Sequence, residues 1–579
     1  MTTFTNMAML PSQRQPEHLH AIVDMGSNGI RYSISTLQPP TARIMPTLYQ
    51  NRVGISLYDA QYSASGERQP IDGPTISAVV ASFQQFKQTC ADFGVLEQNI
   101  TVLATEATRT AINSEDFRGE IKKRVGWDVT MLPKEEEGRV GAMGVASSLP
   151  EVSGLVMDLG GGSTQLSWLV KQNDRADLQM PESGAVSMPY GAAAMSRRLA
   201  EAEKLGKVGE LESEVQTAVR EAYASLRVPK ELDEAARQNG GFTLYLSGGG
   251  FRGWGYVLMS RHRVAPYPIP VINGLKVSRD DFLGIDVVRE AAAATHDNEN
   301  AGEGIFRVSE RRAGQVPAVA FLVTALSQAL PQIKEVRFCQ GGVREGFLFT
   351  SLPAEVRAEH PLVVATRPFD TARPSQGIRN LLISALPSGI TFNTVDDYNG
   401  IFTAELLGAF AGLMYYHSSH SKDLQATAAL RSTTSGILAG MHGVLHESRA
   451  LLALLLCARW GGSVPPSDVS FKQRLEQLIE SPWTLWWINY LGALAGLLAA
   501  VYPAGFIEEV QPRLRLSARW ERTGKGNPLL CLDIAFGSRV AQVALSSEID
   551  RIDKAGKKKR RIGGKDGVGH RVEASLRPQ

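Results

Sequence analysis

Two short Asp-x-Gly segments constrain the fold of this chain more than any other feature. In each, an apolar run that predicts a strand ends in an aspartate and a glycine turn, and a second strand follows: residues 22–34 around Asp24 and residues 154–170 around Asp158. Glycine removes the Cβ atom from the turn, so backbone N–H groups can close around an anion. The repeat predicts two related halves that face each other across a phosphate-binding cleft.

The residues of both turns suit phosphate chemistry. Backbone amides and hydroxyls would donate hydrogen bonds, and each aspartate could hold a magnesium ion or orient a water. The predicted metal ligands are Asp24 and Asp158. The predicted phosphate-binding residues of the two turns are Gly26, Ser27, Asn28, Gly160, Gly161, Gly162, Ser163 and Thr164. The alternative interpretation is a pair of purely structural hairpins.

Four further segments carry a resemblance to a known family. They are Ala-Thr-Glu-Ala-Thr-Arg at 104–109, Glu-Glu-Glu-Gly-Arg at 135–139, Leu-Ser-Gly-Gly-Gly at 246–250 and Gly-Gly-Val-Arg-Glu-Gly at 341–346. With the two hairpins, they resemble the exopolyphosphatase and guanosine pentaphosphate phosphohydrolase family, within the acetate kinase–sugar kinase–actin superfamily. The alternation of strands and helices is typical of such an α/β fold. The resemblance implies two actin-like subdomains, at residues 20–178 and 179–350.

The resemblance also implies roles for single residues. Arg109 would line a polyphosphate site, Glu137 would be the general base for water with Glu136 as second choice, and Arg311 would contact phosphate. The third glycine segment, Gly248, Gly249 and Gly250, would complete the phosphate cradle. A carboxylate held near other carboxylates in a closed cleft has a raised pKa, which suits a base. The plainer alternatives are surface salt bridges for the arginines and helix-dipole carboxylates for residues 135–137.

Two departures from the family pattern bear on catalysis. Gln165 stands where the second hairpin usually has glutamate, and Phe251 stands where the third glycine segment usually has threonine. An amide is neither a metal carboxylate nor a base. We therefore expect ligand binding, by ATP or another polyphosphate with magnesium, but weak turnover.

A further departure concerns a second metal centre. The larger family members carry a His-Asp pair in a helical domain, and the corresponding residues here are Ala458 and Arg459. We expect that centre to be absent. His442 and His446 have the i,i+4 spacing of a chelating pair, and Glu447 is adjacent, but no further ligand is evident.

The rest of the chain divides by composition. Residues 1–19 are polar and predict a flexible N-terminus, residues 351–386 contain four prolines and predict a linker, and residues 387–579 predict a mostly helical domain with short strands. The uncharged run at 483–506 is long enough to span a membrane, but its polar residues favour a buried helix. The basic run at 557–561 predicts a solvated loop or tail, or else a nuclear-import or acidic-partner patch.

Composition narrows the function class. The net charge of +2 argues against a dedicated nucleic-acid binder. Four dispersed cysteines and an N-terminus without signal-peptide character predict a reducing, cytoplasmic location.

The divergent C-terminal part is similar to that of a fungal signalling branch of the family. That resemblance implies a regulator that relays mitochondrial dysfunction to nuclear metabolic genes, binds regulatory signalling proteins and uses the cleft as a nucleotide or polyphosphate sensor. A homodimer is one assembly we consider. The alternatives are an active exopolyphosphatase or guanosine-polyphosphate phosphatase, and a scaffold with an empty cleft.

Overall fold

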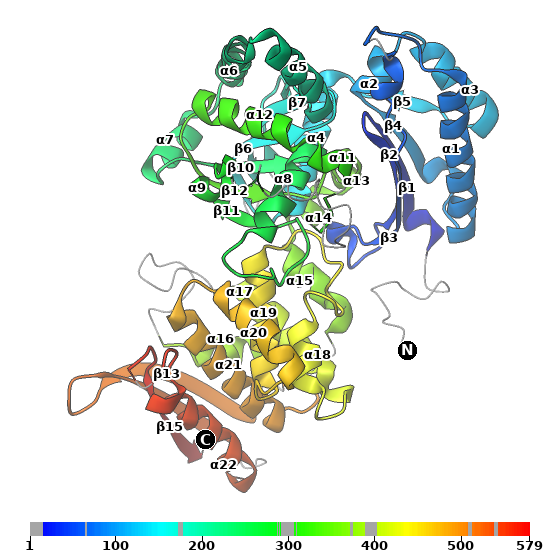
Figure 1. Cartoon of the computed structure of the whole chain (residues 1–579). Coiled ribbons are helices and arrows are strands. Elements are labelled where there is room, and N and C mark those ends of the chain that lie inside the picture. Colours follow the sequence, from blue (N-terminus) through cyan, green and yellow to red (C-terminus); the bar gives the residue numbers. More distant parts are fainter. Residues whose placement is uncertain are drawn as a thin grey trace.

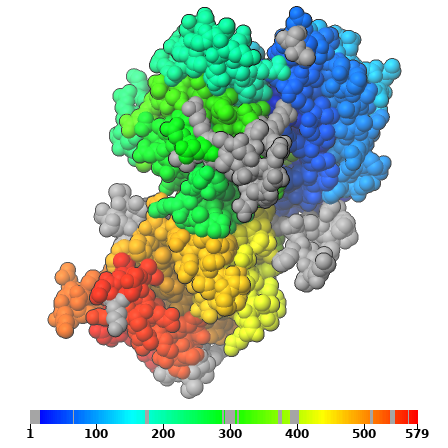
Figure 2. Space-filling view, in the orientation of Figure 1, coloured from blue at the N-terminus to red at the C-terminus, as the bar shows by residue number. Residues whose placement is uncertain are grey.

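The chain forms two α/β lobes side by side and a mostly helical domain beneath them (Figure 1). In the space-filling view, the blue first lobe and the green second lobe meet along a seam, with the yellow-to-red C-terminal domain below (Figure 2). The N-terminal segment predicted at 1–19 is described only from residue 15, and strand β1 already begins at Leu19. The structure, a computed structural model, describes residues 15–63, 66–171, 178–286, 288, 290, 306–308, 310–370, 375–387, 402–507, 512–537, 542–564 and 566–578.

The first lobe is built on a five-stranded sheet of order β3-β2-β1-β4-β5. β1 and β2 form an antiparallel hairpin, and β4 and β5 run parallel to β1. The central strand is buried on both faces, which explains its continuous apolar run from Ala21 to Val23. The strands are β1 (Leu19–Gly26), β2 (Gly29–Thr36), β3 (Thr47–Val53), β4 (Ile100–Ala104) and β5 (Val129–Met131).

The second lobe repeats this arrangement. β6 and β7 form the hairpin, β9 pairs antiparallel with β7, and β10 and β12 extend the sheet in parallel on the other side of β6. β8 and β11 are additional strands at the two edges. The strands are β6 (Val152–Leu159), β7 (Thr164–Lys171), β8 (Leu178–Gln179), β9 (Val186–Met188), β10 (Phe242–Ser247), β11 (Lys276–Ser278) and β12 (Ile333–Phe338). The predicted pair of actin-like halves is therefore present.

The boundary between the halves differs from the prediction. The hairpin around Asp158 was assigned to a first subdomain of residues 20–178, but β6 pairs in parallel with β10 and belongs to the second sheet. The lobes change over between β5 and β6, within the segment 132–151. Sequence patterns detect strands but not their pairing partners. The predicted boundary therefore fell after the β6–β7 hairpin, whereas the lobes divide before it.

Helices cover both sheets. The first lobe carries α1, α2 and α3, and the second carries α5 to α9, α11 and α12. Helices α5 and α6 are separate, because Gly206 adopts a left-handed conformation that ends α5. The helices are α1 (Gly73–Phe93), α2 (Glu106–Thr110), α3 (Ser114–Val125), α5 (Ala192–Leu205), α6 (Val208–Ser225), α7 (Lys230–Gln238), α8 (Gly248–Ser260), α9 (Arg279–Phe282), α11 (Glu310–Ala313) and α12 (Val316–Ala329).

Helix α4 (Lys134–Ser148) connects the two lobes and packs closely against α13 (Val343–Ser351). Glycines permit this approach. A Cβ atom on Gly346 would lie 1.8 Å from the Val140 carbonyl oxygen, and one on Gly144 would lie 2.4 Å from the Gly342 carbonyl oxygen. The glycine segment at 341–346 thus serves helix packing.

The predicted linker at 351–386 is wrong. Its described residues form helices α14 (Ala354–Ala358), α15 (Pro361–Thr366) and α16 (Ser375–Ser384), whose apolar side chains join the C-terminal core. The prolines misled the prediction because proline is favoured in the first turn of a helix as well as in extended segments. Pro361 begins α15, and Pro353 is the N-cap of α14.

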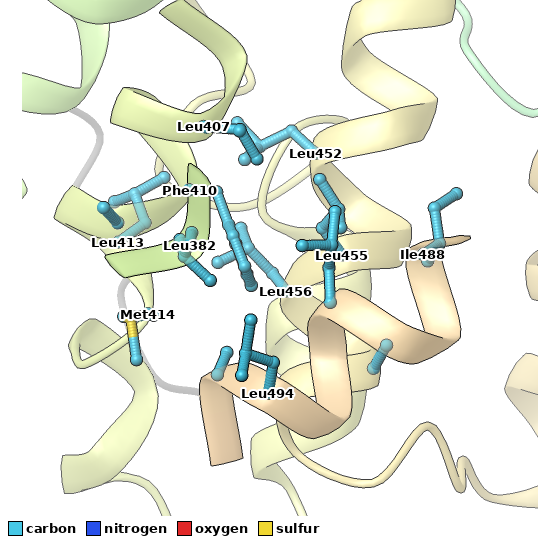
Figure 3. Packing of buried hydrophobic residues seen from close by; sticks show 14 of the residues in the cluster. Leu382, Leu407, Phe410, Leu413, Met414, Leu452, Leu455, Leu456, Ile488 and Leu494 are labelled. Atoms are coloured by element: carbon cyan, nitrogen blue, oxygen red, sulfur yellow. The ribbon is translucent and has the colours of Figure 1, made fainter. Parts of the chain in front are cut away.

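Helix α21 (Pro482–Val501) lies in the centre of the C-terminal domain. It is long and apolar enough to cross a membrane, but 83% of its most apolar window is buried inside the protein. Ile488 and Leu494 belong to one apolar cluster with side chains from α16, α17 (Ala404–Leu413) and α19 (His446–Arg459) (Figure 3). The expectation of a buried helix is confirmed by this packing.

A three-stranded sheet and helix α22 (Gln542–Ala555) complete the C-terminal domain. The basic run predicted as a loop or tail forms an exposed 3₁₀ turn at Lys558–Arg560, between α22 and β15. The remaining helices and strands are α18 (Gln425–Arg431), α20 (Pro466–Gln477), β13 (Leu514–Arg522), β14 (Pro528–Phe536) and β15 (Arg571–Pro578).

Candidate anion-binding cleft

The first hairpin buries Asp24 near the end of β1. Gly26 and Gly29 pair across the turn, and Ser27 within it is buried. Burial raises the pKa of Asp24, while the guanidinium of Arg31, whose Nη1 is 3.6 Å from Asp24 Oδ2, opposes that shift. The hairpin therefore presents a buried carboxylate next to a cation.

The second hairpin forms a loop held from behind by a helix. The amides of Gly191, Ala192 and Ala193 donate to the carbonyl oxygens of Gly162, Gly160 and Gly161, at 3.0, 2.9 and 2.9 Å. The carbonyl oxygens of the loop are therefore already hydrogen-bonded to the N-terminal amides of α5. This contact satisfies donors that a helix N-terminus otherwise leaves unpaired.

The opposite edge of the same loop carries amides. Within the described chain, no acceptor pairs with the backbone N–H groups of Gly161, Gly162 or Ser163. Successive unpaired N–H groups in a tight loop form a concave anion site. The hydroxyl of Thr164 lies elsewhere: it donates to the Tyr190 carbonyl oxygen at 2.8 Å, inside the lobe.

The two hairpins meet across the cleft. A Cβ atom on Gly161 would lie 2.6 Å from Asn28 Nδ2, and one on Gly162 would lie 2.2 Å from Glu106 Oε2. Asn28 and Glu106 belong to the first lobe, so a larger residue at either glycine would have to displace one of these two side chains. The structure thus brings the predicted cradle residues of both lobes together.

The third glycine segment begins helix α8. Ser247, at the end of β10, donates to Asp158 Oδ2 at 2.6 Å. Gly248 has a φ of +92°, and Gly248 and Gly250 pack against Leu159. Gly249 faces the cleft beside Arg31. One of the three predicted glycines therefore reaches the site, and the other two position the helix.

Glu137 lies at the N-terminus of α4, between two donors. Its Oε2 is 3.2 Å from Nη2 of Arg109, and its Oε1 accepts a 3.5 Å hydrogen bond from Nε2 of Gln165. Burial raises the pKa of Glu137 to about 7, against the opposing effect of Arg109. Glu136, the second choice, is instead paired with Arg139 through bonds of 2.8 and 2.7 Å, which lower its pKa.

The carboxylates of Asp24 and Asp158 have the chemistry of a magnesium site. Asp158, like Asp24, has a pKa raised by burial, and the charge of Asp24 raises it further, so the two carboxylates are close. A hard dication such as magnesium prefers carboxylate oxygens and would relieve their repulsion. Among the described residues, no group of three or more His, Cys, Asp or Glu side chains is arranged to hold a metal ion, so water or ligand oxygens would complete the shell.

The histidines of the C-terminal domain are engaged separately. His442 Nε2 is 3.1 Å from Ser147 Oγ, and His446 Nδ1 is 2.8 Å from the Tyr267 hydroxyl. Arg459 stacks on the Trp460 ring. In the described part of the chain these side chains form no shared metal site.

Several arginines of the site were missed by the sequence analysis. A pocket of about 310 Å³ beside Asn28 and Gly249 is lined by Arg31, Arg52 and Arg312. Burial and the charges of neighbouring arginines lower the pKa of Arg312 to about 10. The predicted neighbour, Arg311, has its side chain outside the described residues. Arg31 in β2 and Arg52 in β3 are direct partners across these two strands, a pairing that no local sequence pattern reveals.

Two protein families match successive parts of the chain. Residues 37–355 match the Ppx/GppA phosphatase family, and residues 360–579 match the RTG2 C-terminal domain. The chain belongs to the Ppx/GppA phosphatase family. It is 38% identical over 505 residues to Retrograde regulation protein 2 of Saccharomyces cerevisiae, across 85% of this chain and 82% of that protein.

More distant relatives match shorter stretches. A guanosine-5'-triphosphate,3'-diphosphate pyrophosphatase of Pseudoalteromonas atlantica is 28% identical over 156 residues, which is 27% of this chain and 29% of that protein. The crystal structure of the Aquifex aeolicus Ppx/GppA family member aligns with a TM-score of 0.42 and 20% identity, over 57% of this chain and 96% of that chain.

Proposed function

We propose that this protein is a retrograde signalling regulator that relays the state of mitochondria to nuclear gene expression. The extended similarity to Retrograde regulation protein 2, which includes the C-terminal domain, supports this proposal. The cleft would act as its sensor for a nucleotide such as ATP or for another polyphosphate. The observation that carries the sensor proposal is the meeting of the two hairpins, Asn28 against Gly161, with unpaired amides on one side and arginines on the other.

The ligand would bind through charge and geometry. The backbone amides of residues 161–163 and the guanidiniums of Arg31, Arg52 and Arg312 would receive phosphate oxygens. Asp24 and Asp158 would hold magnesium, which would neutralise part of the phosphate charge. These residues offer no selective contact for a nucleic acid, and we expect none to bind.

Slow turnover is part of the proposal. Gln165 lies opposite Asp158 in the hairpin and points to the same face as Ser163, to which it donates a 3.0 Å hydrogen bond. An amide there cannot bind a metal as a carboxylate would, and it also donates to Glu137, the candidate base. A base held by both Arg109 and Gln165 is poorly placed to accept a proton from water.

One observation favours the second candidate function, phosphoanhydride hydrolysis. Burial raises the pKa of Glu137 to about 7, which suits general-base catalysis near neutral pH. An active exopolyphosphatase or guanosine-polyphosphate phosphatase would use this carboxylate to activate the attacking water. The two functions differ in whether bound ligand is consumed.

The test is calorimetric titration of the purified full chain with ATP, GTP and polyphosphate in the presence of magnesium, followed by phosphate release from each binder. Saturable binding with little release is expected. Rapid release would favour the phosphatase. No binding of any of the three would contradict the sensor proposal.

The cellular setting follows from the same proposal. We expect the protein in the cytoplasm, where it would bind regulatory signalling proteins through its surface. A homodimer is the assembly we would test first, by light scattering of the purified chain.

A further inference from the structure

A large cavity adjoins the arginine pocket and extends to the C-terminal domain. It encloses about 900 Å³, and its lining includes Arg31 of the first lobe, Arg252 of the second lobe, and the segment 437–442 with Arg449 of the C-terminal domain. The three parts of the molecule therefore share one cavity. Its near end is the anion pocket described above, since Arg31 lines both.

The charge of this cavity is unbalanced. Among its described lining residues the only carboxylate is Glu345, which is paired with Arg344 at 3.4 Å, and Arg31 is paired at 3.6 Å with Asp24, which lies outside the lining. The lining cations are Arg31, Arg52, Arg252, Arg307, Arg312, Arg344 and Arg449. Clustered cations repel one another unless an anion lies among them. The cavity is therefore suited to an extended, multiply charged anion.

Arg449 is the cation that the C-terminal domain contributes. Arg449 is 2% exposed, and its guanidinium donates to the carbonyl oxygens of Thr433, Leu438 and Met441, at 2.7, 3.4 and 2.5 Å. Its Nε has no partner, and no carboxylate of the described chain is paired with it. A buried charge without a counter-ion is costly, which makes the far wall of the cavity a second point of attraction for an anion.

The part of the cavity lining formed by the 437–442 segment and Arg449, here called the far wall, is hydrogen-bonded to the rest of the protein. His442 contacts Ser147 at the C-terminal end of α4, and the amide of His446 donates to the Gly274 carbonyl oxygen at 3.3 Å. The N-terminal end of α4 carries Glu137 in the cleft. The wall segment is thus bonded to the helix that carries the candidate base.

We propose that the C-terminal domain supplies the far end of the ligand site, through Arg449 and the 437–442 segment, so that a multiply phosphorylated anion fastens this domain to the two lobes. The inference rests on the proposed sensor function. It identifies the C-terminal domain as the part of the protein that responds when the ligand site is occupied. Orthophosphate would occupy the near pocket alone. A linear polyphosphate or a nucleoside polyphosphate would reach the wall.

Gly440 provides the test. It is exposed, lies on the wall, and a Cβ atom there would meet nothing within 4 Å. Gly440→Asp adds a carboxylate to the wall, and Gly440→Asn is a neutral control of the same shape. Affinity of the full chain for orthophosphate, tripolyphosphate and ATP, each with magnesium, is measured by calorimetry.

Gly440→Asp is expected to weaken binding of the longer anion roughly three- to tenfold relative to Gly440→Asn, with orthophosphate unchanged. An effect on tripolyphosphate alone would assign a linear polyphosphate, and an effect on ATP would assign a nucleoside polyphosphate. Hydrogen exchange in residues 433–449 should slow when that anion binds the wild-type protein. Equal affinities of both variants for every anion that wild type binds would overturn the inference. Failure of wild type to bind any anion would instead contradict the sensor function.

Discussion

Single residues decide whether the cleft only binds its ligand or also consumes it. Glu137 is held between Arg109 on one side and Gln165 on the other, at 3.2 and 3.5 Å. Both neighbours are donors, so they stabilise the carboxylate in place. Burial of Glu137 and the negative charge of the neighbouring Asp158 instead favour the protonated acid, and both raise the pKa of Glu137. The balance of these effects gives two predictions at the residue scale.

The first concerns Gln165→Glu. A glutamate at this position would add a metal-binding or water-polarising carboxylate, and one such electrostatic contact is worth on the order of 10²–10³ in rate. Phosphate release from ATP or polyphosphate should rise by at least about tenfold. Adding Glu137→Ala should remove the gain. A folded Gln165→Glu variant that binds ligand but shows no faster release would mean that catalysis is blocked at more than one position.

The second concerns stability against pH. Glu137 has a pKa of about 7 in the folded protein and an ordinary value of 4.5, so the folded state favours its protonated form. The contribution of Glu137 to the free energy of unfolding is therefore fully present below pH 4.5 and is lost as the pH rises through 7. Glu137→Gln should gain stability relative to wild type between pH 5 and 8, by at most about 3 kcal/mol. Denaturant melts across this range measure the difference, and a constant difference would contradict the assigned burial.

At the scale of elements, the glycine loop depends on the helix behind it. The first turn of α5 donates to the carbonyl groups of 160–162, which leaves the loop amides directed away from the helix. The close approach requires Gly191, because a Cβ atom there would lie 2.3 Å from the Gly162 carbonyl carbon. The clash is with backbone, which cannot move aside as a side chain can.

Gly191→Ala should therefore distort the loop and abolish binding of ATP or polyphosphate by calorimetry. Gly209→Ala is the matched control, because it lies in the first turn of α6 with open space around its Cβ position. The control should bind normally and be slightly more stable, since alanine is favoured over glycine in helices. Normal binding by a folded Gly191→Ala variant would exclude the loop as the phosphate site.

At the scale of the whole molecule, Arg43 joins parts that are distant in sequence. Its side chain is fully buried and donates to the carbonyl oxygens of Arg357, Ser147 and Leu149, at 3.1, 3.2 and 3.3 Å. It thereby connects the first lobe to the end of α4 and to α14. Two of these carbonyls lie at a helix C-terminus, where a cation is favoured.

Arg43→Met would leave three buried carbonyl oxygens without donors. We expect a loss of about 3 kcal/mol or more in the free energy of unfolding, because each buried unsatisfied group costs on the order of 1–3 kcal/mol. Arg198→Met, which breaks a half-exposed ion pair with Glu214, should cost less than about 1 kcal/mol. Chemical denaturation compares the two, and similar losses would show that Arg43 is not a structural link.

The sequence determined the fold class and the centre of the site. Local patterns sufficed there, because a strand, a glycine turn and an aspartate are adjacent in the chain and the duplication repeats them. The polar residues within the uncharged run at 483–506 likewise indicated a buried helix and not a membrane span.

Only the tertiary structure decided which strands pair, where the lobes divide and which cations face the ligand. The second hairpin joins the second sheet through β10, a strand far along the chain, and no local pattern encodes that partner. The prolines at 353–368 begin helices because apolar surface was available to bury them. Arg31, Arg312 and Arg449 converge on one cavity from three domains. Such convergence depends on packing between domains, because residues distant in sequence become neighbours only when the domains assemble.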